Sequence, residues 1–206
     1  APAIAPVIGG FLFTELGWHS IFVFLTVVAV LLWMSVLLML PETLPEAARH
    51  AFSGAALLAG YREVGLNARF LLLALASGVP FNGFFLYVLS APAFLGELHG
   101  LDPRDFWRFF VSAISGMVLG SALSGRLAGR ITPQQQIRFG YTVMVAAVLV
   151  NLAVSIIDVK SLIISFAPLF AYALGWALVV PSVTLKVLDL FPTRRGMASS
   201  LQGFVG

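Results

Sequence analysis

Five long runs without a charged residue constrain this chain more than any other feature of its 206 residues. The runs extend over residues 20–40, 70–96, 109–125, 139–157 and 161–185. A helix needs roughly 17 to 25 predominantly apolar residues to cross the hydrocarbon core of a bilayer, and nearly every run reaches that length. We therefore predict an all-α integral membrane protein that crosses the bilayer several times.

The composition supports this prediction. Hydrophobic residues make up 60% of the chain and charged residues only 10%, whereas soluble domains carry roughly 25% charged residues. Too few charges remain to cover a surface in contact with water, which excludes a water-soluble domain. The net charge of +3 is small and the basic residues lie in short loops, which argues against a nucleic-acid partner. The chain has no cysteine, so disulfides, thiolate metal sites and cysteine nucleophiles are excluded.

The basic residues between the runs predict the orientation in the membrane, because Lys and Arg accumulate in short cytoplasmic loops. One set of alternate loops holds nine of the 12 Lys and Arg residues: Arg49, Arg62, Arg69, Arg126, Arg130, Arg138, Lys186, Arg194 and Arg195. The other set holds Arg104, Arg108 and Lys160. We therefore place the loops with nine basic residues in the cytoplasm and the loops with three outside.

The longest cytoplasmic stretch, residues 41–69, divides the runs into two groups. Its prolines end the preceding helix, and Thr43 with Glu46 matches a T-x-x-E capping box. Within 53–64, apolar residues recur at three- and four-residue spacing, which predicts a short helix lying at the membrane interface. The stretch is therefore predicted to link two helical bundles.

Small residues mark one flank of the first helical stretch, residues 1–14. Two sets recur every four positions: Ala1, Ala5 and Gly9, and Pro2, Pro6 and Gly10. A flank without bulky side chains lets another helix approach closely. The segment APAIAPVIGGFL, followed by GWHSIFVFL, resembles the G-P-x-x-G-G antiporter signature of the major facilitator superfamily, with Ala5 in place of the usual glycine. LPETLP and DLFPTRRGMASSLQG are similar to its Bcr/CflA (bicyclomycin-resistance) branch of drug/proton antiporters.

This resemblance covers essentially the whole chain and implies a partial major-facilitator fold. Residues 1–40 would be the last two helices of the N-terminal bundle, the first of them truncated, 41–69 the cytoplasmic linker, and 70–206 most of the C-terminal bundle. We therefore expect an internal fragment from about helix five to the start of helix eleven. For Pro6, Gly9 and Gly10 the resemblance implies a close contact between bundles that limits leak and favours exchange, with ordinary small-residue packing as the alternative.

A second ladder of small residues lies in the third run. It consists of Ser112, Gly116, Gly120 and Ser124, again at four-residue spacing. We predict that this face packs closely on a partner helix.

The segment after that ladder, GRLAGRITPQQQIR, resembles the second copy of the family's cytoplasmic loop motif. Gly129 stands where the motif usually has an acidic residue. Arg126 and Arg130 therefore remain as candidates for a cytoplasmic gate with Asp189, and a role in setting topology alone is the alternative.

Polar and aromatic residues inside the runs predict a binding cavity, because polar groups are costly in lipid and usually face a cavity or another helix. Asn82 and Phe85 lie on one helix, and Tyr172 and Trp176 share a face of another at four-residue spacing. Such a cavity suits apolar or cationic compounds. Interhelical packing is the alternative for all four residues, and for Asn151 we predict a structural hydrogen bond to a neighbouring helix.

The resemblance implies efflux of small amphiphilic compounds, as in multidrug and antibiotic resistance, across the cytoplasmic (inner) membrane by proton antiport and alternating access. The expected partners are lipid, substrate and protons, with one complete chain acting as a monomer. The five runs contain neither a carboxylate nor a histidine, and the resemblance implies a proton carrier in the first bundle. The alternatives are a transporter of a narrow class of metabolite, such as a sugar or nucleoside, and a non-transport membrane scaffold or receptor.

Enzyme motifs are absent from the sequence. It contains no G-x-x-x-x-G-K-[ST], H-E-x-x-H or G-x-S-x-G pattern, which argues against nucleotide hydrolysis, zinc proteolysis and lipase chemistry. We expect neither an enzyme activity nor a cofactor or metal.

Overall fold

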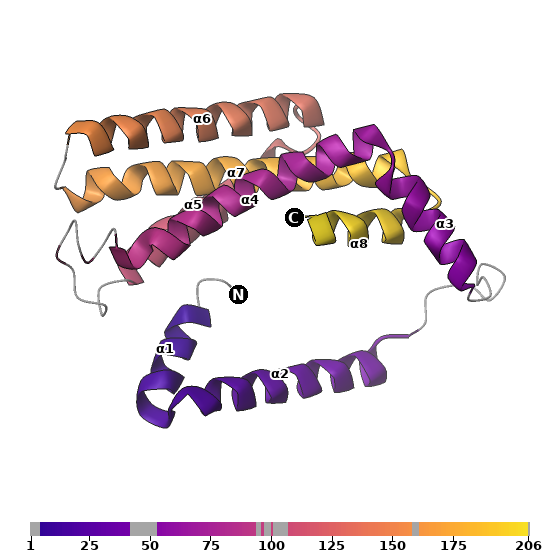
Figure 1. Cartoon of the computed structure of the whole chain (residues 1–206), viewed down its shortest axis with the longest axis horizontal. Helices are drawn as coiled ribbons and strands as arrows, with labels where there is room; N and C mark the ends of the chain where they lie inside the picture. Colours follow the sequence, from indigo (N-terminus) through magenta and orange to yellow (C-terminus); the bar gives the residue numbers. More distant parts are fainter. Residues whose placement is uncertain are drawn as a thin grey trace. The chain divides into compact units, whose positions relative to one another are not determined.

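The computed structural model describes residues 5–41, 53–93, 96, 100, 107–157 and 161–205. Within them all regular structure is helical, and the helices form two compact units, Ala1–Ser53 and Gly54–Gly206 (Figure 1). The predicted all-α class is therefore confirmed.

The first unit contains α1 (Ala5–Leu16) and α2 (Trp18–Met39). Gly17 joins them with φ 80° and ψ 169°, a backbone conformation that is essentially restricted to glycine. The Ser20 hydroxyl donates to the Leu12 carbonyl at 2.9 Å and holds the corner. No side chain of α2 is buried within the unit, which suits an apolar helix surrounded by lipid or by other membrane helices.

The second unit is arranged around one long helix, α7 (Leu162–Leu190). The other helices are α3 (Gly54–Gly65), α4 (Ala68–Ala93), α5 (Trp107–Leu127), α6 (Pro133–Ile157) and α8 (Arg195–Val205). α4, α5, α6 and α8 all pack on α7, and α6 lies beside it over most of its length (Figure 1). Half of the most apolar part of α7 is buried within the unit, compared with about a fifth for α4, α5 and α6. α7 is therefore the core of this bundle.

Two glycines bring α5 into close contact with α7. A Cβ atom added to Gly116 or Gly120 would overlap the backbone carbonyl oxygens of Phe170 and Leu174, respectively. The Ser112 hydroxyl donates to another carbonyl of α7 at 3.2 Å. The predicted packing of this ladder on a partner helix is confirmed, and the partner is α7.

A second pair of glycines brings α6 close to α7. Gly140 and Gly175 face each other, and a Cβ on either residue would lie 2.7 Å from the other's carbonyl oxygen. The buried amide of Gln136 donates to Ser124 Oγ at 2.6 Å and to the Leu178 carbonyl at 3.0 Å. These two bonds tie α5, α6 and α7 together at one level of the bundle.

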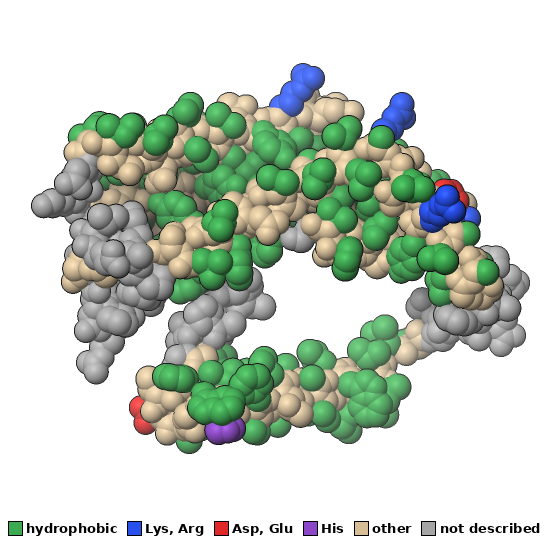
Figure 2. Space-filling view, viewed as in Figure 1, with side chains coloured by type: hydrophobic (Ala, Val, Ile, Leu, Met, Phe, Trp, Pro, Cys, Tyr) green, Lys and Arg blue, Asp and Glu red, His purple; other side chains and the backbone are tan. Residues whose placement is uncertain are grey.

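Five helices are long and apolar enough to cross a membrane: Trp18–Met39, Ala68–Ser90, Arg108–Leu127, Pro133–Ile157 and Leu162–Leu190. They match the five charge-free runs to within a few residues, so that prediction is confirmed. Large hydrophobic side chains are exposed along all five helices. In the second unit, Figure 2 shows hydrophobic side chains over most of the face in view, with Lys and Arg toward the end at which α3 lies. The chain is a multi-pass integral membrane protein.

The short helix predicted in the linker is present as α3, and it packs on α8. Val64 is fully buried, and Tyr61 Oη lies 3.0 Å from Ser200 Oγ of α8. Glu63 forms an ion pair with Arg194, which directly precedes α8. The boundary between the two compact units falls inside the predicted linker. The T-x-x-E capping box lies outside the described residues, and the linker role stays a prediction.

Candidate functional site

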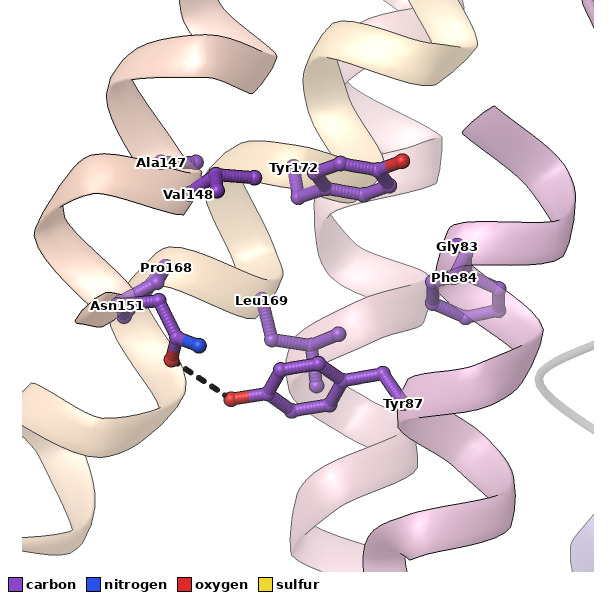
Figure 3. A pocket seen from close by; sticks show the side chains of 9 residues that line it. All are labelled: Gly83, Phe84, Tyr87, Ala147, Val148, Asn151, Pro168, Leu169 and Tyr172. Carbon is purple, nitrogen blue, oxygen red and sulfur yellow. Dashed lines mark hydrogen bonds between the residues drawn. The ribbon is translucent and has the colours of Figure 1, made fainter. Parts of the chain in front are cut away.

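Within the described part of the chain, two cavities without charged lining residues lie between α4 and α7. The α8 cavity, an open groove with a volume of about 300 Å³, is bounded by α8 and lined by Ser77, Phe81, Trp176, Val180, Thr184, Ser199, Gln202 and Gly203. The α6 cavity, with a volume of about 170 Å³, is partly open, bounded by α6 and lined by Gly83, Phe84, Tyr87, Ala147, Val148, Asn151, Pro168, Leu169 and Tyr172 (Figure 3). Small-molecule sites are typically roughly 300 to 1,000 Å³, mostly apolar and furnished with a few polar groups. The α8 cavity has these properties.

Part of the lining of the α8 cavity is polar, and its groups come from three helices. Gln202 of α8 donates from Nε2 to Ser77 Oγ of α4 and to Thr184 Oγ1 of α7, both at 3.2 Å. The Ser77 hydroxyl in turn donates to the Ala74 carbonyl at 3.0 Å. This network fixes a carboxamide inside an apolar bundle.

The lining of the α8 cavity also has an aromatic part. The ring centroids of Phe81 and Trp176 lie 5.4 Å apart, with an angle of 32° between the ring planes. The indole Nε1–H of Trp176 donates to the Ser77 carbonyl at 3.3 Å, which orients the ring. Ring faces attract apolar groups and cations, so the cavity combines flat apolar contacts with hydrogen-bonding groups.

The α6 cavity is mostly apolar, and one hydrogen bond spans it. The hydroxyl of Tyr87 on α4 donates to Oδ1 of Asn151 on α6 at 2.8 Å (Figure 3). The hydroxyl of Tyr172 on α7 points toward α4 and donates to the Pro80 carbonyl at 2.9 Å (Figure 3). The predicted structural bond of Asn151 to a neighbouring helix is confirmed, and its partner is Tyr87.

The structure separates the four residues predicted to line one cavity. Tyr172 and Trp176 do share the α4-facing side of α7, as both donate to carbonyls of α4. Tyr172 lines the α6 cavity, however, and Trp176 lines the α8 cavity. Asn82 donates to the Gly78 carbonyl of its own helix and Phe85 is 48% exposed, so neither lines these cavities. Substrate contact by these four residues stays a prediction.

Sequence reasoning missed the polar lining residues of the α8 cavity. Ser77 and Thr184 are single hydroxyl residues in apolar runs, and such residues often bond only to their own helix. Gln202 lies in a mixed polar and apolar segment, where its amide gives no distinct signal. The three side chains meet because α4, α7 and α8 are each rotated about their own axes to face one another, and the packing of α7 and α8 sets that rotation.

The signature residues lie in the first unit. Gly9 is part of α1, and a Cβ atom added to it would meet no atom within 4 Å. Pro6 and Gly10 are also in α1, and their surroundings lie outside the described part of the structure. The contact between bundles implied for these residues stays a prediction.

The predicted gate residues are not paired as proposed. Asp189, in the last turn of α7, is paired with Arg195 at 4.0 Å between Oδ1 and an Nη atom. Among the described residues, no ion pair joins Asp189 to Arg126 or Arg130. The short turn between α7 and α8 brings Arg195 close, whereas the other two arginines belong to the α5 end and the loop after it. Their role in a gate stays a prediction.

Neither cavity is lined by a charged residue. Within the residues that the structure describes, no group of three or more His, Asp or Glu side chains could hold a metal ion. The cavities therefore offer hydrogen bonds and aromatic contact, which favour binding of a molecule over bond-breaking chemistry.

Comparison with known proteins agrees with the membrane fold. The chain is 29% identical to an uncharacterized MFS-type transporter, YdgK, of Bacillus subtilis. It is 23% identical to a bicyclomycin resistance protein homolog of Haemophilus influenzae and 22% identical to the multidrug transporter MdfA of Yersinia pestis. All three alignments cover 100% of this chain and 50 to 51% of the relative, so the chain spans about half the length of these relatives. Their names describe transport and resistance rather than enzymes.

A family profile gives the assignment. Residues 1–206 match the profile of the Major Facilitator Superfamily over their full length. The bicyclomycin-resistance and multidrug relatives agree with the branch indicated by the sequence motifs. The chain therefore belongs to the Major Facilitator Superfamily.

Proposed function

We propose that this chain forms part of a secondary transporter that exports small amphiphilic compounds across the cytoplasmic membrane in exchange for protons. The relatives named as a multidrug transporter and a bicyclomycin resistance protein homolog support export of such compounds. Alternating access, in which two bundles rock around a central binding site, is the proposed mechanism.

The α8 cavity is the observation that carries this proposal. It lies between three helices of one bundle and combines the neighbouring rings of Phe81 and Trp176 with the hydrogen-bonding group of Gln202. Aromatic faces tolerate substrates of varied shape, because contact with a ring does not require a fixed set of hydrogen bonds. A cation over such a ring gains roughly 0.5 to 2 kcal/mol. These properties suit compounds with an aromatic body and a polar or cationic end.

Proton exchange is the proposed source of energy. A potential of 100 mV moves one elementary charge with about 2.3 kcal/mol. Neither cavity is lined by a carboxylate or a histidine, so the proposal places the proton carrier elsewhere in the complete protein. Gly9, with Pro6 and Gly10, has the proposed role of keeping proton and substrate movement coupled.

Export of a narrow class of metabolite, such as a sugar or nucleoside, is the second candidate. The Gln202, Ser77 and Thr184 network favours it, since polar solutes need fixed hydrogen-bond partners. The aromatic wall and the absence of charged residues from the cavity lining favour the amphiphile.

Ethidium efflux from pump-deficient cells that express the full-length protein tests the proposal. We expect efflux above the vector control, and its loss when an uncoupler collapses the proton gradient. Efflux that persists under the uncoupler would contradict proton exchange. No efflux from cells with folded protein in the membrane would favour the metabolite transporter.

Two substitutions connect the efflux to this chain. Trp176→Ala removes a cavity ring and should reduce efflux about 2- to 30-fold, the equivalent of one ring–cation contact. Trp33→Ala is the matched control, because Trp33 lies on α2 and is 63% exposed within its unit. Gly9→Leu should abolish coupled efflux at normal expression. Equal efflux for Trp176→Ala and Trp33→Ala would remove the α8 cavity from the proposal.

A further inference from the structure

The side-chain amide of Gln202 has an orientation in the α8 cavity that its neighbours impose. Ser77 has one hydroxyl hydrogen, which it donates to the Ala74 carbonyl at 3.0 Å. Towards any further partner, Ser77 Oγ can therefore act only as an acceptor. The Gln202 group 3.2 Å away from it must then be the NH₂ group rather than the carbonyl oxygen.

Both hydrogens of this NH₂ group are used within the bundle. One is donated to Ser77 Oγ and the other to Thr184 Oγ1, at 3.2 Å each. The remaining polar atom of the side chain is Oε1, and no described residue donates to it. No buried side-chain oxygen or nitrogen in the described structure lacks a partner, so Oε1 keeps an open surface. Gln202 lines the α8 cavity, and this surface is available to a molecule inside it.

The acceptor and the rings of Phe81 and Trp176 line the same cavity. Trp176 uses its indole N–H on the Ser77 carbonyl, at 3.3 Å, so it offers a bound molecule its ring rather than a donor. The cavity lining contains no carboxylate. A cationic ligand would therefore be held by the amide oxygen and the aromatic rings, without an ion pair.

We propose that the α8 cavity selects aromatic amphiphiles with an N–H donor, which Gln202 Oε1 accepts while Phe81 and Trp176 contact the aromatic body. The inference rests on the proposed export of amphiphiles and specifies their chemistry. A protonated tertiary amine fits this site, because it carries one N–H beside the charge. The quaternary ammonium of the same skeleton has the same charge and no N–H, so it makes the ring contacts and leaves the acceptor unpaired.

Binding of two matched probes to the purified full-length protein tests the inference. The probes are anthracenylmethyl-dimethylamine, at a pH well below the pKa of the amine, and its anthracenylmethyl-trimethylammonium counterpart. Equilibrium dialysis, read by anthracene fluorescence, measures both affinities. We expect the wild-type protein to bind the tertiary amine about tenfold or more tightly, because a hydrogen bond from a charged donor contributes that much. Equal affinities would overturn the inference.

Gln202→Met separates the hydrogen bond from the added methyl group. Met has nearly the length of Gln and no amide, so the tenfold preference should disappear while the affinity for the quaternary probe stays unchanged. A steric effect of the extra methyl group would survive this substitution, and a preference that persists in Gln202→Met overturns the inference. The unchanged quaternary affinity also reports that the aromatic part of the cavity is intact.

Ser77→Ala provides a second variant if Gln202→Met does not fold. It removes the lone pairs that fix the amide and leaves Gln202 free to turn, so the preference should fall several-fold. An unchanged preference would overturn the inference. Efflux of both probes from cells separates this outcome from failure of the proposed function. If cells export both probes but the purified protein binds them with equal affinity, only the proposed role of Gln202 is rejected. If cells export neither probe, the proposed export of amphiphiles is rejected.

Discussion

The two sides of α7 are built in different ways. Toward α5 and α6, glycines such as Gly120 and Gly140 allow backbone to approach backbone, and an added Cβ would overlap the facing helix. Toward α4, the contacts are made by long aromatic side chains, and Tyr172 and Trp176 reach across to carbonyl oxygens of α4. The α8 cavity lies on this second side, and the α6 cavity lies where this side meets α6. We call the first the glycine side of α7 and the second the aromatic side.

This difference explains where a substrate can bind. Close packing of small residues leaves no volume for a ligand, and many short van der Waals contacts stabilise it. Aromatic side chains hold helices farther apart and leave gaps at their edges, and hydrogen bonds to backbone carbonyls keep the spacing defined. The glycine side therefore acts as a fixed scaffold, and the aromatic side provides space.

The largest effect is expected from Gly120→Ala on the glycine side. The added Cβ would overlap the Leu174 carbonyl and lie 2.8 Å from Ala177 Cβ, so α5 must move away from α7. We expect a loss of about 1 to 3 kcal/mol in stability, typical of overpacking. Gly125→Ala is the matched control on the same helix, because its Cβ would meet no atom within 4 Å. Thermal unfolding of the detergent-purified full-length protein measures both, and equal melting temperatures would break the comparison.

A somewhat smaller effect is expected from Gln136→Leu, which tests whether the glycine side depends on polar bonds as well. Its amide is 5% exposed and bonds to Ser124 and to the Leu178 carbonyl. Loss of both hydrogen bonds, partly offset by burial of the apolar Leu side chain, should lower the free energy of unfolding by about 1 to 2 kcal/mol. Gln135→Leu at the start of the same helix is the control, since Gln135 is exposed and bonds to Thr132. If both variants unfold at the wild-type temperature, packing alone holds this side.

On the aromatic side we expect the stability of the bundle to depend less on any single side-chain group. Tyr172→Phe removes one bond, from the hydroxyl to the Pro80 carbonyl, and leaves the ring in place. The expected loss of stability is about 0.5 to 1.5 kcal/mol, the net value of one hydrogen bond. The same unfolding measurement applies, with Tyr61→Phe on α3 as the comparison: its hydroxyl pairs with Ser200 at the exposed surface, where water replaces the lost bond, so its loss of stability should be smaller. A loss larger than that of Gly120→Ala would mean that hydrogen bonds, rather than glycine packing, hold this bundle together.

The sequence predicted the elements of this fold well, because membrane spans depend on local composition. Charge-free runs marked all five apolar helices, and the spacing of Gly116 and Gly120 predicted a close helix contact that the structure shows against α7. The prediction for Asn151 also succeeded, since an amide in an apolar span needs a partner wherever the helix rotates. Each of these depends on a residue and its immediate neighbours in the chain.

The arrangement of the candidate site could not be predicted in the same way. Tyr172 and Trp176 were correctly placed on one face, yet the tilt of α4 across α7 directs them to different cavities. Gln202 became relevant only once α8 had packed beside Ser77 and Thr184. The position of one helix relative to another is set by the summed contacts of both, and no local pattern records it.

The smallest effect is expected from Gly9→Ala in α1, which extends the comparison to a glycine with open surroundings. Since no atom lies within 4 Å of the added Cβ, nothing has to move, and Ala favours a helix over Gly by up to about 1 kcal/mol. The melting temperature should therefore stay at the wild-type value or rise slightly, in contrast to Gly120→Ala. A fall as large as that of Gly120→Ala would mean that Gly9 has a close helix neighbour in the complete protein, as the antiporter signature implies. Glycine spacing alone would then indicate close packing in both units, although Gly9 has open surroundings within its own unit.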